Sequence, residues 1–197
     1  MNPITQPGWL GIAAHYPSPN FNARPSETIV NLLVIHSISL PPDEFSSGDV
    51  IDFFQNKLKQ SKSPFYQQLK DVKVSAHFFI EREGRIVQFV STNDRAWHAG
   101  ISSFCGQEDC NNYSIGIELE GCDTFPFTET QYHSLKILKD ILMAQYPGIT
   151  EDRIVSHAEI ALPPGRKTDP GPLFDWSQLK GSLNFLTLPP TIRKYTA

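Results

Sequence analysis

The sequence has little of several features that would assign it to a specialised class of protein. It contains three cysteines, Cys105, Cys110 and Cys122, an odd set that excludes a fully paired disulfide framework and fits reduced thiols. No stretch approaches 18 consecutive apolar residues, which excludes a membrane-spanning helix. Residues Met1 to Trp9 show neither the basic nor the apolar region of a secretory signal. We therefore expect a cytoplasmic protein.

An excess of charge of one sign is also missing. The chain has 17 Lys and Arg against 21 Asp and Glu, for a net charge of -4. This balance gives no electrostatic reason to expect nucleic acid or a membrane surface as a partner. The length of 197 residues and 40% hydrophobic content suit one globular domain over residues 1–197, which we expect to act as a monomer. Sixteen prolines, above the usual share of about 5%, indicate long fixed loops.

One such loop, residues 157–172, combines the side chains that a hydrolytic metal site needs. His157 and Asp169 are the imidazole and carboxylate types that bind zinc, and Lys167 lies two positions before Asp169. In an extended segment Lys167 and Asp169 point to the same side, so a cation would face the space in front of the metal. Taken alone, this stretch is also compatible with a solvated surface turn. The two cysteines Cys105 and Cys110 are a weaker alternative, because they supply only two ligands.

Two further stretches add imidazole and carboxylate groups. Residues 31–36 form a short apolar run typical of a buried strand, with His36 at the carboxyl end, where ligand sites of α/β sheets tend to lie. A core histidine is the alternative. Residues 111–121 alternate so that Glu118 and Glu120 share one face with Gly116, a residue that often marks close approach of a ligand or backbone. An acidic outer face of an edge strand is the alternative, and alternation does not distinguish Glu118 from Glu120.

These motifs carry a resemblance to a known family. The sequence resembles the zinc-dependent N-acetylmuramoyl-L-alanine amidases, and most closely the AmpD type, which processes 1,6-anhydro-muropeptides in the cytoplasm. The resemblance runs from about residue 8 to residue 176 and keeps the order of the family's motifs. It is carried by the runs LLVIH (32–36), VSAHF (74–78), RAWHAG (95–100), YSIGIELEG (113–121) and GRKTDPGP (165–172).

The resemblance implies zinc as the cofactor and a muropeptide as the substrate. His36, His157 and Asp169 correspond to the zinc ligands, and Glu118 and Lys167 to the catalytic groups. Only the resemblance selects Glu118 over Glu120. Two alternatives remain: a peptidoglycan-binding module without catalysis, and a wall-lytic amidase acting on intact peptidoglycan. The full ligand set argues against the first, and the lack of an export signal against the second.

Two residues beside these motifs are candidates for substrate binding. Trp97 and His98 form a Trp-His pair in a Gly-containing loop, which can supply a stacking wall and a hydrogen-bond donor for a sugar or peptide. His77 competes as a ligand, but its strand position favours a satisfied core histidine. Ser37 and Asp109 depart from residues common in the family, and the link from His157 to Lys167 is two residues longer than usual.

The pattern of elements predicts an α/β fold with a central mixed β-sheet of five or six strands flanked by helices, and the site along one edge. Residues 46–58 and 128–146 are expected to be helices, the second with a Thr128–Gln131 capping box. Residues 74–80 and 85–90 predict a hairpin, and residues 153–156 a strand that delivers His157. Residues 1–26 are expected to be irregular, and 61–70 a polar connector.

Overall fold

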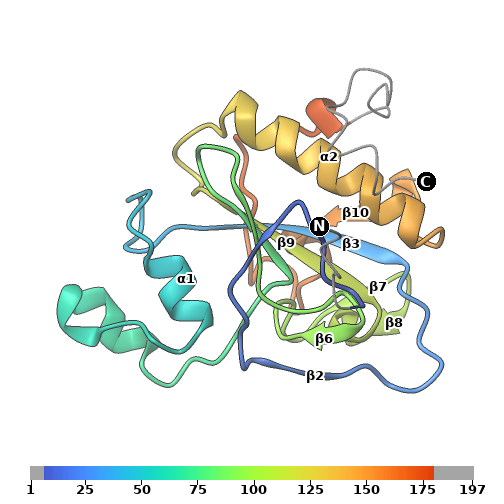
Figure 1. Cartoon of the computed structure of the whole chain (residues 1–197), viewed down its shortest axis with the longest axis horizontal. Coiled ribbons are helices and arrows are strands. Elements are labelled where there is room, and N and C mark those ends of the chain that lie inside the picture. The colour runs from blue at the N-terminus through green and yellow to red at the C-terminus, as the bar shows by residue number, and fades with distance from the viewer. Residues whose placement is uncertain (1–6, 180–197) are drawn as a thin grey trace, which may run out of the picture.

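The computed structural model describes residues 7–179. A six-stranded sheet lies at its centre, with β3, β9 and β10 visible in Figure 1. The strands follow the order β1-β5-β4-β9-β3-β10. Four of the five neighbouring pairs are parallel, whereas β4 and β5 form an antiparallel hairpin, so the predicted mixed sheet is confirmed. The bounds are β1 (Ala14–His15), β3 (Leu32–Ile38), β4 (Phe78–Ile80), β5 (Ile86–Gln88), β9 (Ser114–Glu120) and β10 (Ile154–Ser156).

The two longest strands, β3 and β9, lie side by side in the middle of the sheet and are parallel. Their register pairs His36 with Glu118. Residues paired across neighbouring strands point to the same face of a sheet, so the side chains of His36 and Glu118 lie on one face. All seven residues of β9 are buried. The alternative of an exposed acidic edge strand is therefore wrong.

The helix α2 (Glu129–Gln145) covers the other face of the sheet (Figure 1). Thr128 and Gln131 form the predicted capping box, and the rings of Phe127 and Tyr132 meet edge to face with centroids 6.3 Å apart. The expected stripe of Leu135, Leu138 and Leu142 is buried against apolar side chains of the strands. This helix, predicted from local signals alone, is confirmed.

The helix α1 (Asp49–Phe54) packs on the opposite face, against β4 and β5. The prediction of a helix over residues 46–58 is wrong in length, because Gly48 is the N-cap and Asn56 adopts a left-handed φ of 57°. The supposed polar connector contains two 3₁₀ helices, η1 (Gln60–Lys62) and η2 (Pro64–Leu69). Tyr66 of η2 is fully buried and donates a hydrogen bond to Asp49, which holds η2 against α1.

The N-terminal arm is more regular than the sequence indicates. Besides β1, which joins the edge of the main sheet, it contains β2 (Phe21–Ala23), paired antiparallel with β6 (Asp94–Ala96). A second small sheet pairs β7 (Ser103–Phe104) with β8 (Gln107–Glu108), followed by the 3₁₀ helix η3 (Cys110–Asn112). Residues 1–6 of the arm lie outside the described residues.

The C-terminal part adds the edge strand β10 to the main sheet and then continues into short helices and loops. The 3₁₀ helix η4 (Glu151–Arg153) precedes β10, and α3 (His157–Ile160) begins directly after it. The last described element is η5 (Trp176–Leu179). The strand predicted over 153–156 is confirmed apart from Arg153, which belongs to η4. It delivers His157 next to β3.

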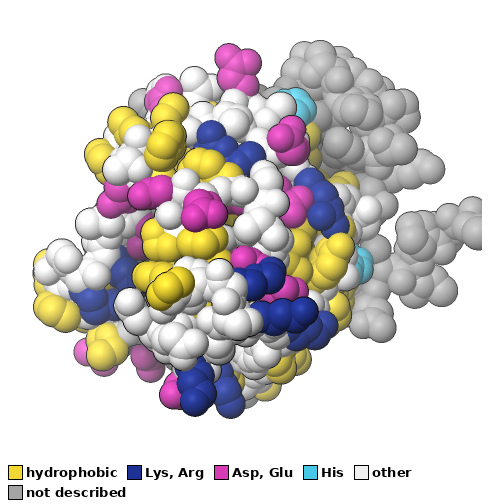
Figure 2. Space-filling model, turned by 90° about the vertical axis from the view of Figure 1, so that its left-hand side faces the viewer, with side chains coloured by type: hydrophobic (Ala, Val, Ile, Leu, Met, Phe, Trp, Pro, Cys, Tyr) yellow, Lys and Arg dark blue, Asp and Glu magenta, His cyan; other side chains and the backbone are white. Residues whose placement is uncertain are grey.

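The surface on the α1 side carries both signs of charge (Figure 2). Lys and Arg side chains are interspersed with Asp and Glu, and neither sign covers the face. Within residues 7–179, no helix has the length and hydrophobicity that crossing a bilayer requires.

Candidate active site

Three predicted ligands meet on the sheet face opposite α2. The Nδ1 atom of His36 lies 3.0 Å from Nδ1 of His157 and 3.1 Å from Oδ2 of Asp169, and the last two atoms are 3.0 Å apart. Across residues 7–179, this is the one group of His, Cys, Asp or Glu side chains close enough to hold a metal. Two imidazoles and a carboxylate are the donor set of a catalytic zinc site with one open position. The residues present therefore fit zinc.

Each ligand is positioned by a different element. His36 belongs to β3, and His157 is the first residue of α3, whose start is fixed by a capping box between Ser156 and Glu159. The loop that carries Asp169 is tied back to α3, because the backbone N–H of Ala158 donates to the carbonyl of Asp169 at 3.1 Å. The cluster thus lies beside the edge strand β10, on a face of the sheet rather than along its rim.

Burial and mutual contact shift the pKa values of these groups. Burial lowers the pKa of His36 to about 4, which keeps its imidazole neutral and able to bind a metal at neutral pH. Burial alone would raise the pKa of Asp169, but its close contacts with the imidazoles of His157 and His36 outweigh burial and hold that pKa well below its usual range. Asp169 is therefore ionised, as a carboxylate ligand must be.

The two carboxylates of β9 have different environments, although they share a face. Glu120 accepts hydrogen bonds from the backbone N–H groups of Ser46 and Arg82, one on each oxygen. Glu118 is 9% exposed, and its Oε2 atom is buried with no hydrogen-bond partner. A buried polar atom without a partner is costly, so Glu118 is the carboxylate with capacity for substrate or water. Burial and the nearby Asp169 raise the pKa of Glu118 well above its usual value.

A cavity of about 280 Å³ opens in front of the cluster. It is lined by all seven residues predicted for the site: His36, Trp97, His98, Glu118, His157, Lys167 and Asp169. Its remaining wall is largely apolar and comes from α1, η2 and the segment after η2, with Phe53, Leu69 and Val72. A larger hollow of about 630 Å³ beside α2 contains none of the seven.

Trp97 and Lys167 lie at the mouth of this cavity. The half-buried Trp97 is fixed by a hydrogen bond from its Nε1–H to Asn22 at 2.7 Å. Lys167 is exposed, and it lines the same cavity as Asp169, as their spacing predicts. Both side chains can therefore reach a bound molecule.

His98 occupies a different environment from the one expected of a substrate-binding residue. Its Nδ1 lies 2.9 Å from Nε2 of His36, and its Nε2 lies 3.2 Å from Oγ of Ser114. The empty position at Gly116 receives this ring, because a Cβ there would be 2.5 Å from Nδ1 of His98. Burial lowers the pKa of His98 well below its usual value.

His77 is the core histidine that the sequence predicts. It is fully buried, and its Nδ1 accepts a hydrogen bond from the N–H of Gly116.

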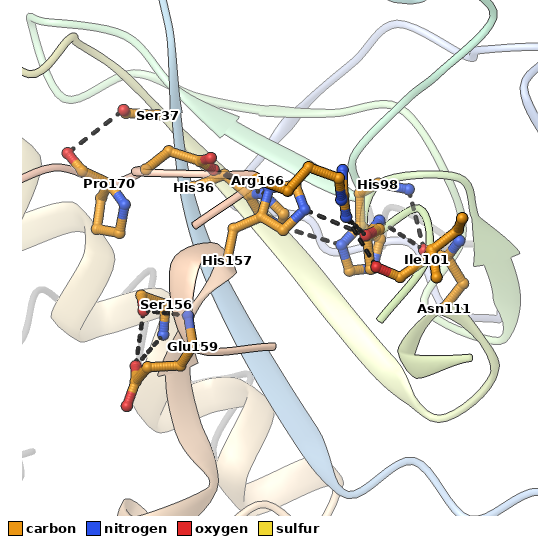
Figure 3. A network of polar contacts seen from close by, with 12 residues as sticks. His36, Ser37, His98, Ile101, Asn111, Ser156, His157, Glu159, Arg166 and Pro170 are labelled. Atoms are coloured by element: carbon orange, nitrogen blue, oxygen red, sulfur yellow. Dashed lines mark hydrogen bonds and ion pairs between the residues drawn. The ribbon is translucent and has the colours of Figure 1, made fainter. Parts of the chain in front are cut away.

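Several residues behind the cluster were not found from the sequence (Figure 3). The carbonyl of Ala99 lies 3.1 Å from Nε2 of His157 and accepts a hydrogen bond from Arg166 at 3.2 Å. Asn111 accepts from the backbone N–H groups of both His98 and Ala99. These partners come from distant parts of the chain, and no local sequence pattern identifies them.

The buried His-His-Asp cluster, with a carboxylate and a lysine in the same cavity, has the residue types that a mononuclear metal hydrolase requires. Residues 25–172 match the family described as N-acetylmuramoyl-L-alanine amidase. The chain belongs to this family.

Similar proteins agree with this assignment. The chain is 52% identical over 166 residues to 1,6-anhydro-N-acetylmuramyl-L-alanine amidase AmpD of Haemophilus influenzae, covering 84% of this chain and 89% of the relative. A crystal structure of a selenomethionine AmpD derivative has a TM-score of 0.85 at 44% identity, covering 89% and 97% of the two chains. The amidase AmiD of Escherichia coli, in complex with anhydro-N-acetylmuramic acid-L-Ala-D-γ-Glu-L-Lys, has a TM-score of 0.56 at 32% identity, covering 79% and 59%.

Proposed function

We propose that this chain hydrolyses the amide bond between the lactyl group and L-alanine in 1,6-anhydro-N-acetylmuramoyl-peptides, as an enzyme of cell-wall recycling. AmpD of Haemophilus influenzae, half identical over most of the chain, carries this substrate in its name. The observation that carries the proposal is the convergence of His36, His157 and Asp169 beside Glu118, whose buried oxygen has no partner.

We assign zinc to the cluster of His36, His157 and Asp169. When bound, zinc supplies Lewis acidity that polarises the scissile carbonyl and makes water a stronger acid. The neutral imidazole of His36 and the ionised carboxylate of Asp169 are in the protonation states that binding requires. Since three side chains form the set, each of them is indispensable.

Glu118 is proposed as the general base and acid. Its carboxylate lines the cavity and has an oxygen without a partner, so it can accept a proton from the attacking water. The raised pKa makes it a better base than an exposed glutamate and lets it return the proton to the leaving amine of L-alanine. Glu120 is excluded from this role, because both of its oxygens accept from backbone N–H groups.

Lys167 is proposed to stabilise the negative charge that develops on the lactyl carbonyl oxygen. Lys167 belongs to the same loop as Asp169 and lines the same cavity. It also favours the ionised form of Glu118, lowering a pKa that burial raises. A fixed positive charge beside a developing oxyanion typically contributes about 10²- to 10³-fold to the rate.

Trp97 and the apolar wall of Phe53, Leu69 and Val72 suit the compact anhydro sugar. An ordinary muramoyl sugar adds a reducing-end hydroxyl, and burying it against apolar side chains without a partner costs about 1 to 3 kcal/mol. We therefore propose that the cavity favours anhydro-muropeptides over reducing-sugar muropeptides by roughly 5- to 150-fold.

We further propose that the chain is a single domain that works as a monomer in the cytoplasm. The described structure has one main sheet, and Cys105, Cys110 and Cys122 are free thiols, which suits a reducing compartment. Gel filtration with light scattering tests the monomer. Fractionation of cells tests the location.

The decisive experiment compares kcat/KM for anhydro and reducing-sugar muropeptides that carry the same stem peptide, with the zinc content of the enzyme measured in parallel. We expect about one zinc per chain and faster cleavage of the anhydro substrate. The Trp97→Ala variant should retain zinc and lose part of the preference. Equal rates on the two sugars, or efficient digestion of intact sacculi, would indicate a wall-lytic amidase instead.

A further inference from the structure

The feature that goes beyond the catalytic groups is the position of His98, behind one of the ligands. Its ring lies over β9 at the position where Gly116 has no side chain, and it is 9% exposed. Both of its nitrogens have protein partners, His36 on one side and Ser114 on the other. Binding a substrate through either nitrogen would require one of these contacts to break. The geometry therefore argues for a role inside the protein.

The position of His36 in the cluster determines which histidine donates the hydrogen bond between His36 and His98. The Nδ1 atom of His36 faces His157 and Asp169, so Nδ1 is the atom that offers its lone pair to a metal. A neutral imidazole that ligates through Nδ1 carries its hydrogen on Nε2. This hydrogen points to Nδ1 of His98, 2.9 Å away. His98 must accept it and must therefore carry its own hydrogen on Nε2.

The contact of His98 with Ser114 gives the same direction of hydrogen bonding independently. The hydroxyl of Ser114 donates to the carbonyl of Cys110 at 2.6 Å. Its oxygen is then left to accept from Nε2–H of His98 at 3.2 Å. Because a backbone carbonyl can only accept, the chain of hydrogen bonds from Cys110 through Ser114 and His98 to His36 has a single consistent polarity.

The loop that carries His98 is fixed as well. The side-chain oxygen of Asn111 accepts from the N–H groups of His98 and Ala99, at 3.0 and 2.8 Å. The carbonyl of Ala99 lies 3.1 Å from Nε2 of His157, so the same loop supports the second imidazole ligand through a hydrogen-bond acceptor. Both histidines of the cluster thus have their outer nitrogens directed to neighbouring residues of one loop.

We propose that His98 is a positioning residue that holds His36 in the Nε2–H tautomer and so presents its Nδ1 lone pair to zinc. The inference rests on the zinc site assigned under the proposed function. Groups that hydrogen-bond to the outer nitrogen of a ligating histidine fix the orientation and the tautomer of its ring, and their loss typically weakens metal binding about 10- to 100-fold.

The test uses three substitutions of His98 that differ in where they place a polar atom. His98→Asn puts an amide oxygen near the position of Nδ1, where it can accept from His36. His98→Gln puts its polar atoms near the position of Nε2, beside Ser114, and His98→Leu has none. Zinc affinity of each full-length protein is measured by competition with a chromophoric chelator. The melting temperature of each metal-free protein shows whether the fold is retained.

We expect His98→Leu and His98→Gln to bind zinc about 10- to 100-fold more weakly than the wild type. His98→Asn should bind it more tightly than either of them. Wild-type affinity in His98→Leu, or equal losses in His98→Asn and His98→Gln, would overturn the proposal. If the wild type binds no zinc, the metal site itself is wrong, and the inference falls with it.

A measurement on the wild type covers the case in which the variants fail to fold. Long-range ¹⁵N–¹H correlation spectra of the histidine rings report which nitrogen carries the hydrogen. We expect the Nε2–H tautomer for both His36 and His98 in the zinc-loaded protein. A hydrogen on Nδ1 of His98 would overturn the proposal, whatever the variants do.

Discussion

The two faces of the central sheet are built from the same strands and have opposite characters. Toward α2, strands β3 and β9 present a continuous apolar layer that includes Leu33, Ile35 and Ile117. Toward the cavity, the same two strands present His36 and Glu118, with Ser114 beneath the ring of His98. Alternation along each strand separates the two sets, so that one face packs against the scaffold helix and the other presents the groups proposed for catalysis.

The comparison also shows how polar groups are tolerated on a buried face. His36, His77, His98 and Glu120 all have hydrogen-bond partners, which offsets the cost of removing them from water. Glu118 departs from this rule, since one of its oxygens has none. The difference predicts that substitutions on the cavity face change chemistry more than stability, and that substitutions on the α2 face do the reverse.

The largest loss of activity is expected from substitutions of the proposed metal ligands. His157→Ala should lose zinc and all measurable turnover, because a three-ligand site has no spare protein ligand. The apolar face under α2 is untouched, so the fold should be retained. Metal analysis and an amidase assay measure the two losses. His133→Ala, on the exposed side of α2, is the matched control and should resemble the wild type. Tight binding of one zinc by His157→Ala would show that the ligand set is wrong.

The next largest loss of activity should distinguish the two carboxylates of β9. Glu118→Gln should retain zinc and lose about 10²- to 10⁴-fold in kcat, the usual contribution of a general acid or base. Glu120→Gln should lose much less in kcat, because both oxygens of Glu120 already accept hydrogen bonds from backbone N–H groups. Steady-state kinetics on both variants make the comparison. Equal losses in kcat would contradict the assignment of roles.

Lys167→Met should have a smaller effect on turnover. It removes the charge beside the developing oxyanion while keeping the length of the side chain, so kcat should fall about 10²- to 10³-fold. Zinc content should not change. Lys57→Met is the control, since Lys57 is exposed and does not line the cavity. The assignment fails if Lys167→Met changes KM alone.

The smallest effect on catalysis is expected on the α2 face. Leu138→Ala removes a fully buried side chain from the apolar layer and should destabilise the protein by about 2 to 5 kcal/mol. Denaturant unfolding measures this loss. At temperatures where the variant is folded, its zinc content and kcat should equal those of the wild type. A large loss of kcat in the folded variant would show that the two faces are coupled.

Elements with local signals were predicted well from the sequence. The capping box and the leucine stripe identify α2, and strict alternation identifies β9. The short strands β1 and β2 were missed because they exist only through pairing with β5 and β6, more than 70 positions away. The expected helix over 46–58 was too long, since its pattern did not reveal the left-handed turn at Asn56.

The site shows the same division between local and long-range information. His36, His157 and Asp169 were identified by residue type and resemblance, and the structure brings them together. The environments of Glu118 and Glu120 differ because of backbone groups of Ser46 and Arg82, which are 74 and 38 positions from Glu120. The contact of His98 with His36 spans 62 positions. Such contacts depend on the complete fold, and a single sequence does not contain a local pattern for them.

The separation of the two histidines along the chain links metal supply to folding. His36 and His157 are 121 positions apart and meet because β3 pairs with β10. An unfolded chain does not hold these two imidazoles together with Asp169, so zinc at the proposed site would bind the native state in preference. At a free zinc concentration 100 times the dissociation constant, this preference adds about 2.7 kcal/mol to the free energy of unfolding. The concentration of free zinc would thereby set the proportion of chains that escape unfolding and proteolysis, in addition to the proportion that is active.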